Sequence, residues 1–175
     1  MVRKLKVVEK NFIYNSIYQI FAIIVPLFTT PYLSRTLGVE GIGQYAYAYS
    51  IVYYFSIFIT LGLNSYGNRT IAIIKKDSTQ IATTFWNIYA MQILGGMIVF
   101  IAYILFCVLW NKSSLINYVM IGVIISSCLD ITWFFYGMEE FKKTTIRDIV
   151  IKIITIICIF GLIHNESDVW KYALI

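Results

Sequence analysis

The feature that constrains this chain most is a proline-containing segment, PLFTTPYLSRTLGVEGIG at residues 26–43, which directly follows a long apolar run. Pro26 and Pro31 each remove a backbone donor from a helix, so the carbonyl groups that they free need partners from neighbouring helices, hydroxyl groups or a wet cavity. Nearby hydroxyl side chains are placed to help: Thr29, Thr30 and Ser34. We therefore predict a membrane-spanning helix that is kinked at both prolines, ends at Gly38 and does not face lipid on all sides.

The composition is that of a membrane protein rather than a soluble one. Of the 175 residues, 59% are hydrophobic and 13% are charged, whereas a soluble chain is about half apolar and about a quarter charged. The net charge of +5 does not by itself indicate a nucleic-acid partner, because its meaning depends on where the basic residues lie. No nucleic-acid partner is predicted. Three cysteines lie inside apolar runs without a CxxC pair, so we expect no disulfide, metal site or cofactor.

The apolar segments predict an all-α membrane protein, a polytopic helix bundle with five full spans and the start of a sixth. A helix rises ~1.5 Å per residue, so about 20 residues cross a ~30 Å hydrocarbon core. The fifth segment is short but can lengthen back to Thr144 if Arg147 and Lys152 extend toward the headgroups. The spans are expected at about residues 12–33, 42–63, 85–109, 115–137, 149–163 and, incomplete, 169–175.

The connections between these spans complete the predicted organisation. The N-terminal basic flank resembles a signal peptide, but no small-residue cleavage site follows, so the first span is expected to be retained. Residues 64–84 are expected to form a loop with a short amphipathic helical piece at the membrane surface, and residues 138–148 a charged loop. Because the sequence stops inside its sixth apolar segment, we expect it to be a fragment.

The positions of the basic residues predict the orientation of the chain. Loops on the cytoplasmic side of a membrane protein carry an excess of Lys and Arg. The opposite side would hold only three of the fourteen basic residues: Arg35, Lys112 and Lys171. The N-terminus, the second loop and the fourth loop hold the rest: Arg3, Lys4, Lys6, Lys10, Arg69, Lys75, Lys76, Lys142, Lys143, Arg147 and Lys152. We therefore predict a cytoplasmic N-terminus.

Polar residues recur on one face of each of the first two spans. Asn15 and Gln19 share a face with Pro26, and amide groups are costly against lipid, so this face should point into the bundle or a cavity. Tyr49 and Tyr53 lie deeper in the second span than an interfacial anchor would. They are candidates for ligand contact, although packing and hydrogen bonding between helices is the favoured role for them.

Asp130 is the sharpest charge inside a predicted span. Such a carboxylate can pair with an arginine, bind a coupling cation or take up a proton. Its structural alternative is a helix-end carboxylate that reaches the inner interface beyond Gly137. We favour a buried role, because Ser126 and Trp133 share its helical face.

Three strings of the sequence resemble a known family. IVPLFTTPYLSRTLGVEGIGQYAYAYSIVYYF, LGLNSYGNRTIA and DITWFFYGMEEFK are similar to the amino-terminal half of bacterial polysaccharide-biosynthesis membrane proteins. These are the O-antigen (lipopolysaccharide) and capsule repeat-unit flippases of the multidrug/oligosaccharidyl-lipid/polysaccharide exporter superfamily. The resemblance covers residues 11–148 in matching order, and PYLSRTLG with the following glycine pair is its most specific part.

The resemblance implies a transporter of the bacterial inner membrane, with two bundles of six helices around an alternately open cavity. The chain would supply most of the first bundle, and the carboxy-terminal bundle would be absent. The implied substrate is an oligosaccharide on a polyprenyl diphosphate carrier, flipped from the cytoplasmic to the outer leaflet. Membrane lipids, a coupling cation or proton, and polysaccharide polymerase machinery are further expected partners. No ATP-binding loop is present, so an ion gradient or the membrane potential would drive the step.

That substrate needs polar groups in the cavity and a fixed positive charge for its diphosphate. Asn15, Gln19, Tyr49 and Tyr53 would supply the first, and Arg35 is the best candidate for the second. Arg69 would meet the headgroup at the cytoplasmic mouth. Both arginines have a structural alternative as anchors at the membrane surface.

Two alternatives from other classes remain open at this point. The chain could be a membrane-embedded enzyme of the same pathway, such as a polymerase or acyltransferase, although the sequence offers no cluster of acid, base or metal-binding residues and we predict no enzyme. It could also be a half-size transporter that dimerises. The unfinished sixth span argues against the second alternative.

Overall fold

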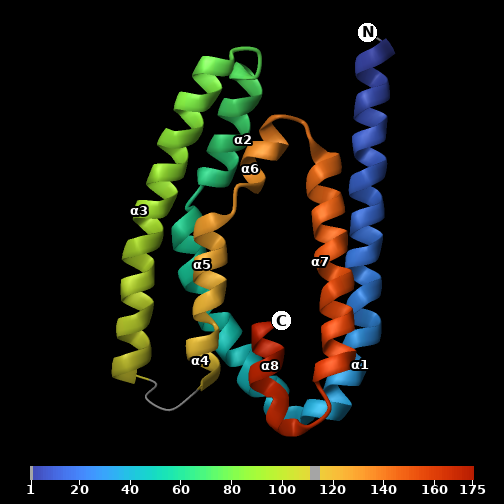
Figure 1. The fold of residues 1–175 in the computed structure, drawn as a ribbon, viewed down its shortest axis with the longest axis vertical. Helices are drawn as coiled ribbons and strands as arrows, with labels where there is room; N and C mark the ends of the chain where they lie inside the picture. The colour runs from blue at the N-terminus through green and yellow to red at the C-terminus, as the bar shows by residue number, and fades with distance from the viewer. Residues whose placement is uncertain (1, 111–114) are drawn as a thin grey trace.

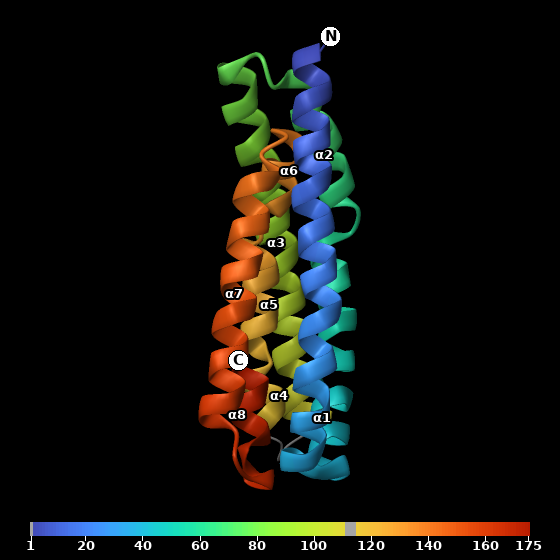
Figure 2. The ribbon, with the colours of Figure 1, turned by 90° about the vertical axis from the view of Figure 1, so that its right-hand side faces the viewer.

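The computed structural model describes the backbone of residues 2–110 and 115–175, and the side chains of residues 16, 18–109 and 115–175. Every regular element in these ranges is a helix, which confirms the all-α prediction. The helices stand side by side in an elongated bundle (Figures 1 and 2). In chain order they are α1 (Val2–Thr60), α2 (Leu63–Ile74), α3 (Ser78–Trp110), α4 (Leu115–Val119), α5 (Ile121–Leu129), α6 (Thr132–Gly137), α7 (Phe141–Leu162), η1 (Glu166–Asp168) and α8 (Val169–Leu174).

The first two predicted spans both lie in α1, which Gly38 divides into two arms. Gly38 has φ 69° and ψ 174°, a combination that is accessible to glycine and strained for other residues. The chain reverses there, so that the first arm descends and the second returns (Figure 1). The predicted end of the first helix at Gly38 is confirmed. Pro26 and Pro31 lie within helical backbone, and the kinks expected at them stay a prediction.

The two arms of α1 and the helices α3, α4, α5 and α7 enclose the larger apolar core. Between membrane helices such a core is held by close van der Waals packing rather than by exclusion of water. A hydrogen bond also joins α1 to the end of α7, since the phenol hydroxyl of Tyr32 donates to the carbonyl of Ile163 over 2.7 Å. The most completely buried members of the core are Leu37, Val52, Ile59, Tyr103, Cys107, Met120, Ile124 and Ile163.

A second, smaller cluster joins α2, α3 and α6 around Ile71, Ile88 and Trp133. The short amphipathic helix expected within residues 64–84 is present as α2, but the expected loop is wrong, because α2 stands upright beside α3 and α6 and α3 already begins at Ser78 (Figure 1). The sequence of α2 is polar on one side, while Ile71 on the other side is fully buried. Only residues 75–77 connect α2 to α3.

The charged loop expected at residues 138–148 is also shorter in the structure. α6 ends at Gly137 and α7 already begins at Phe141. Two ion pairs hold the short turn, with Lys75 Nζ 2.7 Å from Glu139 Oε1 and Lys143 Nζ 2.5 Å from Glu140 Oε2. Pairing lets these charges sit on helices and a tight turn rather than in an extended loop.

Three stretches of the described chain are long and apolar enough to cross a membrane, at Tyr18–Ile74, Ser78–Leu109 and Leu115–Gly137. The first contains the reversal at Gly38 and is therefore long enough for two crossings. The protein is a multi-pass membrane protein. The N-terminus and the α2–α3 and α6–α7 turns lie toward one end of the bundle, while the reversal of α1 and η1 lie at the other (Figure 1). The segments that hold most of the basic residues therefore share one end of the bundle, as the predicted topology needs. Which end faces the cytoplasm stays a prediction.

Candidate functional site

The fourth predicted span, at about residues 115–137, is interrupted next to Asp130. α5 ends at Leu129 and α6 begins at Thr132, and Asp130 has the extended values φ −72° and ψ 114°. Asp130 Oδ1 accepts a hydrogen bond from the backbone N–H of Thr132 over 3.0 Å and another from the Thr132 hydroxyl. The carboxylate therefore caps the first turn of α6 and supplies a partner for a backbone donor that the break would leave unpaired.

Arg147 on α7 connects this break to the neighbouring helix. Its Nη2 donates to the Thr132 hydroxyl oxygen over 3.0 Å, and the same guanidinium lies 2.8 Å from Asp148 Oδ1. Asp130, Thr132, Arg147 and Asp148 thus form a continuous polar chain from the end of α5 to α7. Of the roles weighed for Asp130, an arginine partner comes nearest to this geometry, although the contact passes through a hydroxyl group.

Aromatic side chains surround the polar chain on the neighbouring helices. The ammonium group of Lys152 on α7 lies 5.3 Å from the centre of the Tyr18 ring on α1, within the range of a cation–π contact. Tyr136 on α6 is close enough to Asp130 and Arg147 to interact with both electrostatically. The first arm of α1 thus contributes to the same region as the polar chain.

Tyr49 and Tyr53 belong to a ladder of stacked tyrosines on the second arm of α1. The ring centres of Tyr45 and Tyr49 are 5.8 Å apart, and those of Tyr49 and Tyr53 are 6.0 Å apart. The planes differ by only 16° and 21°, as expected for side chains four residues apart on one helix. Tyr172 on α8 covers the ring of Tyr45 at 4.3 Å, whereas Tyr49 and Tyr53 stay 42% and 52% exposed.

The other predicted site residues are not gathered in one place. Gln19 and Arg35 are exposed on the first arm of α1, and Arg69 is exposed on α2. Arg35 lies close to the reversal at Gly38, while α2 lies toward the opposite end of the bundle (Figure 1). Asn15 is in the helical backbone of α1, but its side chain lies outside the described residues.

Sequence analysis missed two groups at the break, Gln92 and Thr132. Gln92 is completely buried in α3 and bonds to the backbone of residues 127–130. Gln92 could have been predicted from the sequence, because an amide within the apolar third span needs a hydrogen-bond partner inside the protein as much as Asn15 and Gln19 do. Thr132 gave no such signal, since threonine is common in membrane helices.

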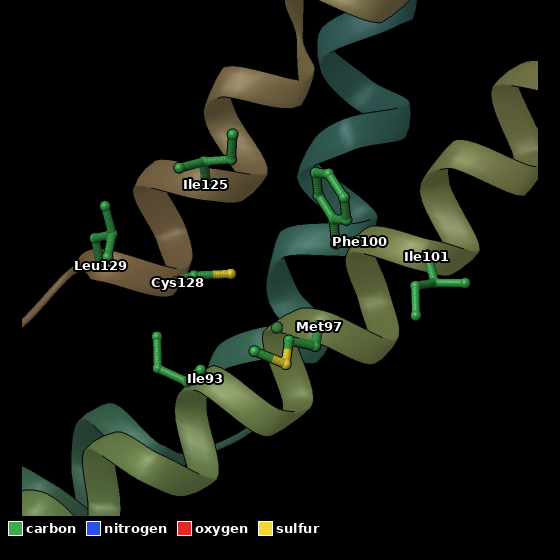
Figure 3. A pocket seen from close by; sticks show the side chains of 8 residues that line it. Ile93, Met97, Phe100, Ile101, Ile125, Cys128 and Leu129 are labelled. Carbon is green, nitrogen blue, oxygen red and sulfur yellow. The ribbon is translucent and has the colours of Figure 1, made fainter.

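An apolar hollow of about 340 Å³ lies between α3 and α5 (Figure 3). Ile93 and Met97 line it from α3, and Ile125, Cys128 and Leu129 line it from α5. Such a lining is suited to hydrocarbon and offers nothing to a sugar or a diphosphate. The hollow is therefore separate from the polar chain, although both lie beside the same helix break.

Comparisons with known proteins identify the family of the chain. A family model described as "Polysaccharide biosynthesis protein" matches residues 8–175. The chain belongs to this family. No solved structure matches it significantly.

Two curated relatives are much longer than the chain. A protein of Escherichia coli (strain K12) named "Putative O-antigen transporter" is 26% identical over 164 residues, which is 92% of this chain and 40% of the relative. A Haemophilus influenzae (strain Rd) protein named "Uncharacterized membrane protein" is 32% identical over 120 residues, 67% of this chain and 28% of the relative. The chain thus spans well under half the length of either.

Proposed function

We propose that the chain forms part of a transporter that flips a polyprenyl-diphosphate-linked oligosaccharide from the cytoplasmic to the outer leaflet of the bacterial inner membrane. The transported unit would serve the synthesis of surface polysaccharide such as O-antigen or capsule. The observation that carries the proposal is the polar chain from Asp130 to Arg147, which lies in a multi-pass helix bundle of the polysaccharide biosynthesis protein family. The transporter name of the E. coli relative supports the same class.

The chemistry of such a substrate explains why polar groups are kept within membrane helices. A sugar headgroup and a diphosphate lose their hydration in hydrocarbon at a prohibitive cost, so a protein surface must replace the lost hydrogen bonds and charge. The exposed rings of Tyr49 and Tyr53 offer aromatic faces and hydroxyl groups to sugar rings. Arg35 and Arg69, exposed toward opposite ends of the bundle, are candidates to receive the diphosphate on the two sides of the membrane.

Alternating access also requires an energy source and a part that responds to it. We propose that a proton or cation gradient, or the membrane potential, supplies the energy. Asp130 is the candidate for the responding group, because a carboxylate within a membrane span can take up a proton or bind a cation, and this carboxylate also caps α6. Loss of that charge would weaken the cap and the contact of Thr132 with Arg147.

The test is a strain that lacks the gene for the full-length protein. We expect surface polysaccharide to disappear while lipid-linked repeat units accumulate on the cytoplasmic leaflet, which extraction of labelled lipids would measure. Complementation with Asp130→Asn or Arg35→Ala should reduce export about tenfold, equivalent to roughly 1.4 kcal/mol in the transport barrier. Lys142→Ala, an exposed charge next to α7's start, should complement fully.

The same strain separates transport from an enzyme of the pathway. Single repeat units displayed on the outer surface without polymer would indicate a polymerase instead, and polymer that lacks an acyl group would indicate an acyltransferase. Unchanged surface polysaccharide would contradict all three. The proposal of a transporter requires the accumulated unit to remain on the inner leaflet.

A further inference from the structure

The break between α5 and α6 leaves backbone groups that need partners inside the predicted fourth span. A helix end frees carbonyl groups of its last turn, and water is scarce in the hydrocarbon region. Asp130 satisfies the N–H side of the break by capping Thr132. On the carbonyl side, the oxygens of Ser127 and Cys128 at the end of α5 accept from one side chain of another helix.

That side chain is Gln92 of α3, which has no exposed surface. Its Nε2 lies 2.9 Å from the carbonyl oxygens of Ser127 and Asp130 and 3.2 Å from that of Cys128, so its two hydrogens are donated to three acceptors and one of them is shared. Its Oε1 accepts from the indole Nε1 of Trp133 on α6 over 3.1 Å. One amide therefore binds both sides of the break.

The direction of this amide follows from its partners. Carbonyl oxygens can only accept, and an indole N–H can only donate, so Nε2 must face the three carbonyls and Oε1 must face Trp133. Three carbonyl oxygens that converge on one point form the arrangement with which broken helices of transporters coordinate a cation. Here an uncharged NH₂ group occupies that point.

We propose that Gln92 is a positioning residue that takes the place of a bound cation at the α5–α6 break. By fixing the carbonyl of Asp130 and the indole of Trp133, it holds Thr132 where its hydroxyl meets Arg147. The break is then a permanent feature of the bundle, stable without an ion. An ion that drives transport would act elsewhere, for example at the carboxylate of Asp130.

The test compares variants of the full-length protein in detergent, by thermal unfolding and by the indole N–H resonances of ¹⁵N-labelled tryptophan. Gln92→Leu keeps the approximate volume and removes both polar groups. We expect the unfolding midpoint to fall by about 5 °C and the Trp133 indole resonance, assigned with Trp133→Phe, to move. Gln80→Leu makes the same change at an exposed position of α3 and should do neither.

Gln92→Glu provides a rescue that packing alone would not produce. Its protonated carboxyl can donate to one carbonyl and accept from Trp133, whereas the carboxylate is repelled by the three carbonyl oxygens. The midpoint and the indole resonance should therefore approach those of the native protein at pH 5 and those of Gln92→Leu at pH 8. The comparison of Gln92→Glu at the two pH values also tests the proposal if Gln92→Leu does not fold.

Replacing choline by Na⁺ or K⁺ at constant ionic strength tests the remaining part of the proposal. The native protein should unfold at the same temperature in all three salts. A midpoint that rises specifically with Na⁺ or K⁺ and loses that response in Gln92→Leu would show that the break binds a cation with Gln92 as a ligand. That result, or a Gln92→Leu protein indistinguishable from Gln80→Leu, would overturn the proposal.

Discussion

Gly67 lies against the indole ring of Trp133 so closely that a Cβ atom at residue 67 would stand 2.5 Å from Cε3. This contact joins α2 to α6 and explains why the segment after the second arm of α1 is a packed helix rather than a surface loop. Trp133 is also the residue that Gln92 holds at its indole nitrogen. The side chain of Trp133, next to the α5–α6 break, therefore contacts both α2 and α3.

Gly67→Ala should destabilise the protein by about 1–3 kcal/mol, because the new methyl group overpacks this contact. In an open helix the same substitution would be favourable by up to about 1 kcal/mol. Thermal unfolding in detergent measures the difference. Gly122→Ala in α5 is the matched control, since nothing lies within 4 Å of its added Cβ. Equal midpoints for the two variants would contradict the packing of α2 on Trp133.

Gly38→Ala should cost about 1–3 kcal/mol, because its φ of 69° with ψ of 174° is strained for any residue with a side chain. The reversal between the two arms of α1 depends on that backbone conformation. Gly43→Ala, five residues later and with no neighbour within 4 Å, should be tolerated. A Gly38→Ala protein as stable as Gly43→Ala would mean that the chain does not reverse at residue 38.

Thr132→Val should cost about 1 kcal/mol, because it removes the hydroxyl that links Asp130 to Arg147. Arg147 is 43% exposed, so Arg147→Ala should cost less than about 1 kcal/mol. The informative quantity is the coupling in a double-mutant cycle of unfolding free energies, which we expect at about 0.5–1 kcal/mol. Additive single effects would show that the two side chains do not interact.

Asp168, in the connection before α8, should make stability depend on pH only under strongly acidic conditions. The backbone N–H of His164, the Lys171 ammonium and the N–H of Asn165 hold the pKa of its carboxyl at about 2, below the usual value of about 3.9. A lowered pKa stabilises the fold fully above about pH 4, and the contribution is lost as the pH falls toward 2. The midpoint gap between the native protein and Asp168→Asn should therefore be constant from pH 5 to 7 and shrink below pH 4. A gap that widens on acidification would contradict the assignment.

Single cysteines should report the orientation of the bundle in intact cells. Glu166 and Lys76 are both exposed. Glu166 begins η1 and Lys76 belongs to the α2–α3 turn, and these two segments lie at opposite ends of the bundle (Figure 1). If the N-terminus is cytoplasmic, Glu166→Cys should react with a membrane-impermeant maleimide from outside, and Lys76→Cys only after permeabilisation. A protein with its three native cysteines replaced supplies the background. The reverse labelling pattern would invert the predicted topology.

The sequence by itself determined the features that depend on local chemistry. Long apolar segments have few alternatives to membrane helices, because the bilayer leaves backbone groups no other partners. Gly38 could be identified as the end of the first helix from its place after the proline-containing segment. The start of α8 at Val169 likewise follows from the change of hydrophobicity after Asp168.

Only the tertiary structure decided what the polar residues inside the spans contact. Asp130 was visible as a charge, and its cap on Thr132 is local, but the contact of Thr132 with the guanidinium of Arg147 depends on how α7 packs beside α6. Gln92 and the carbonyls of residues 127–130 are more than thirty residues apart in the sequence. At the break, a buried amide on one helix donates hydrogen bonds to carbonyl groups of another helix, and no pattern within either helix contains that pairing.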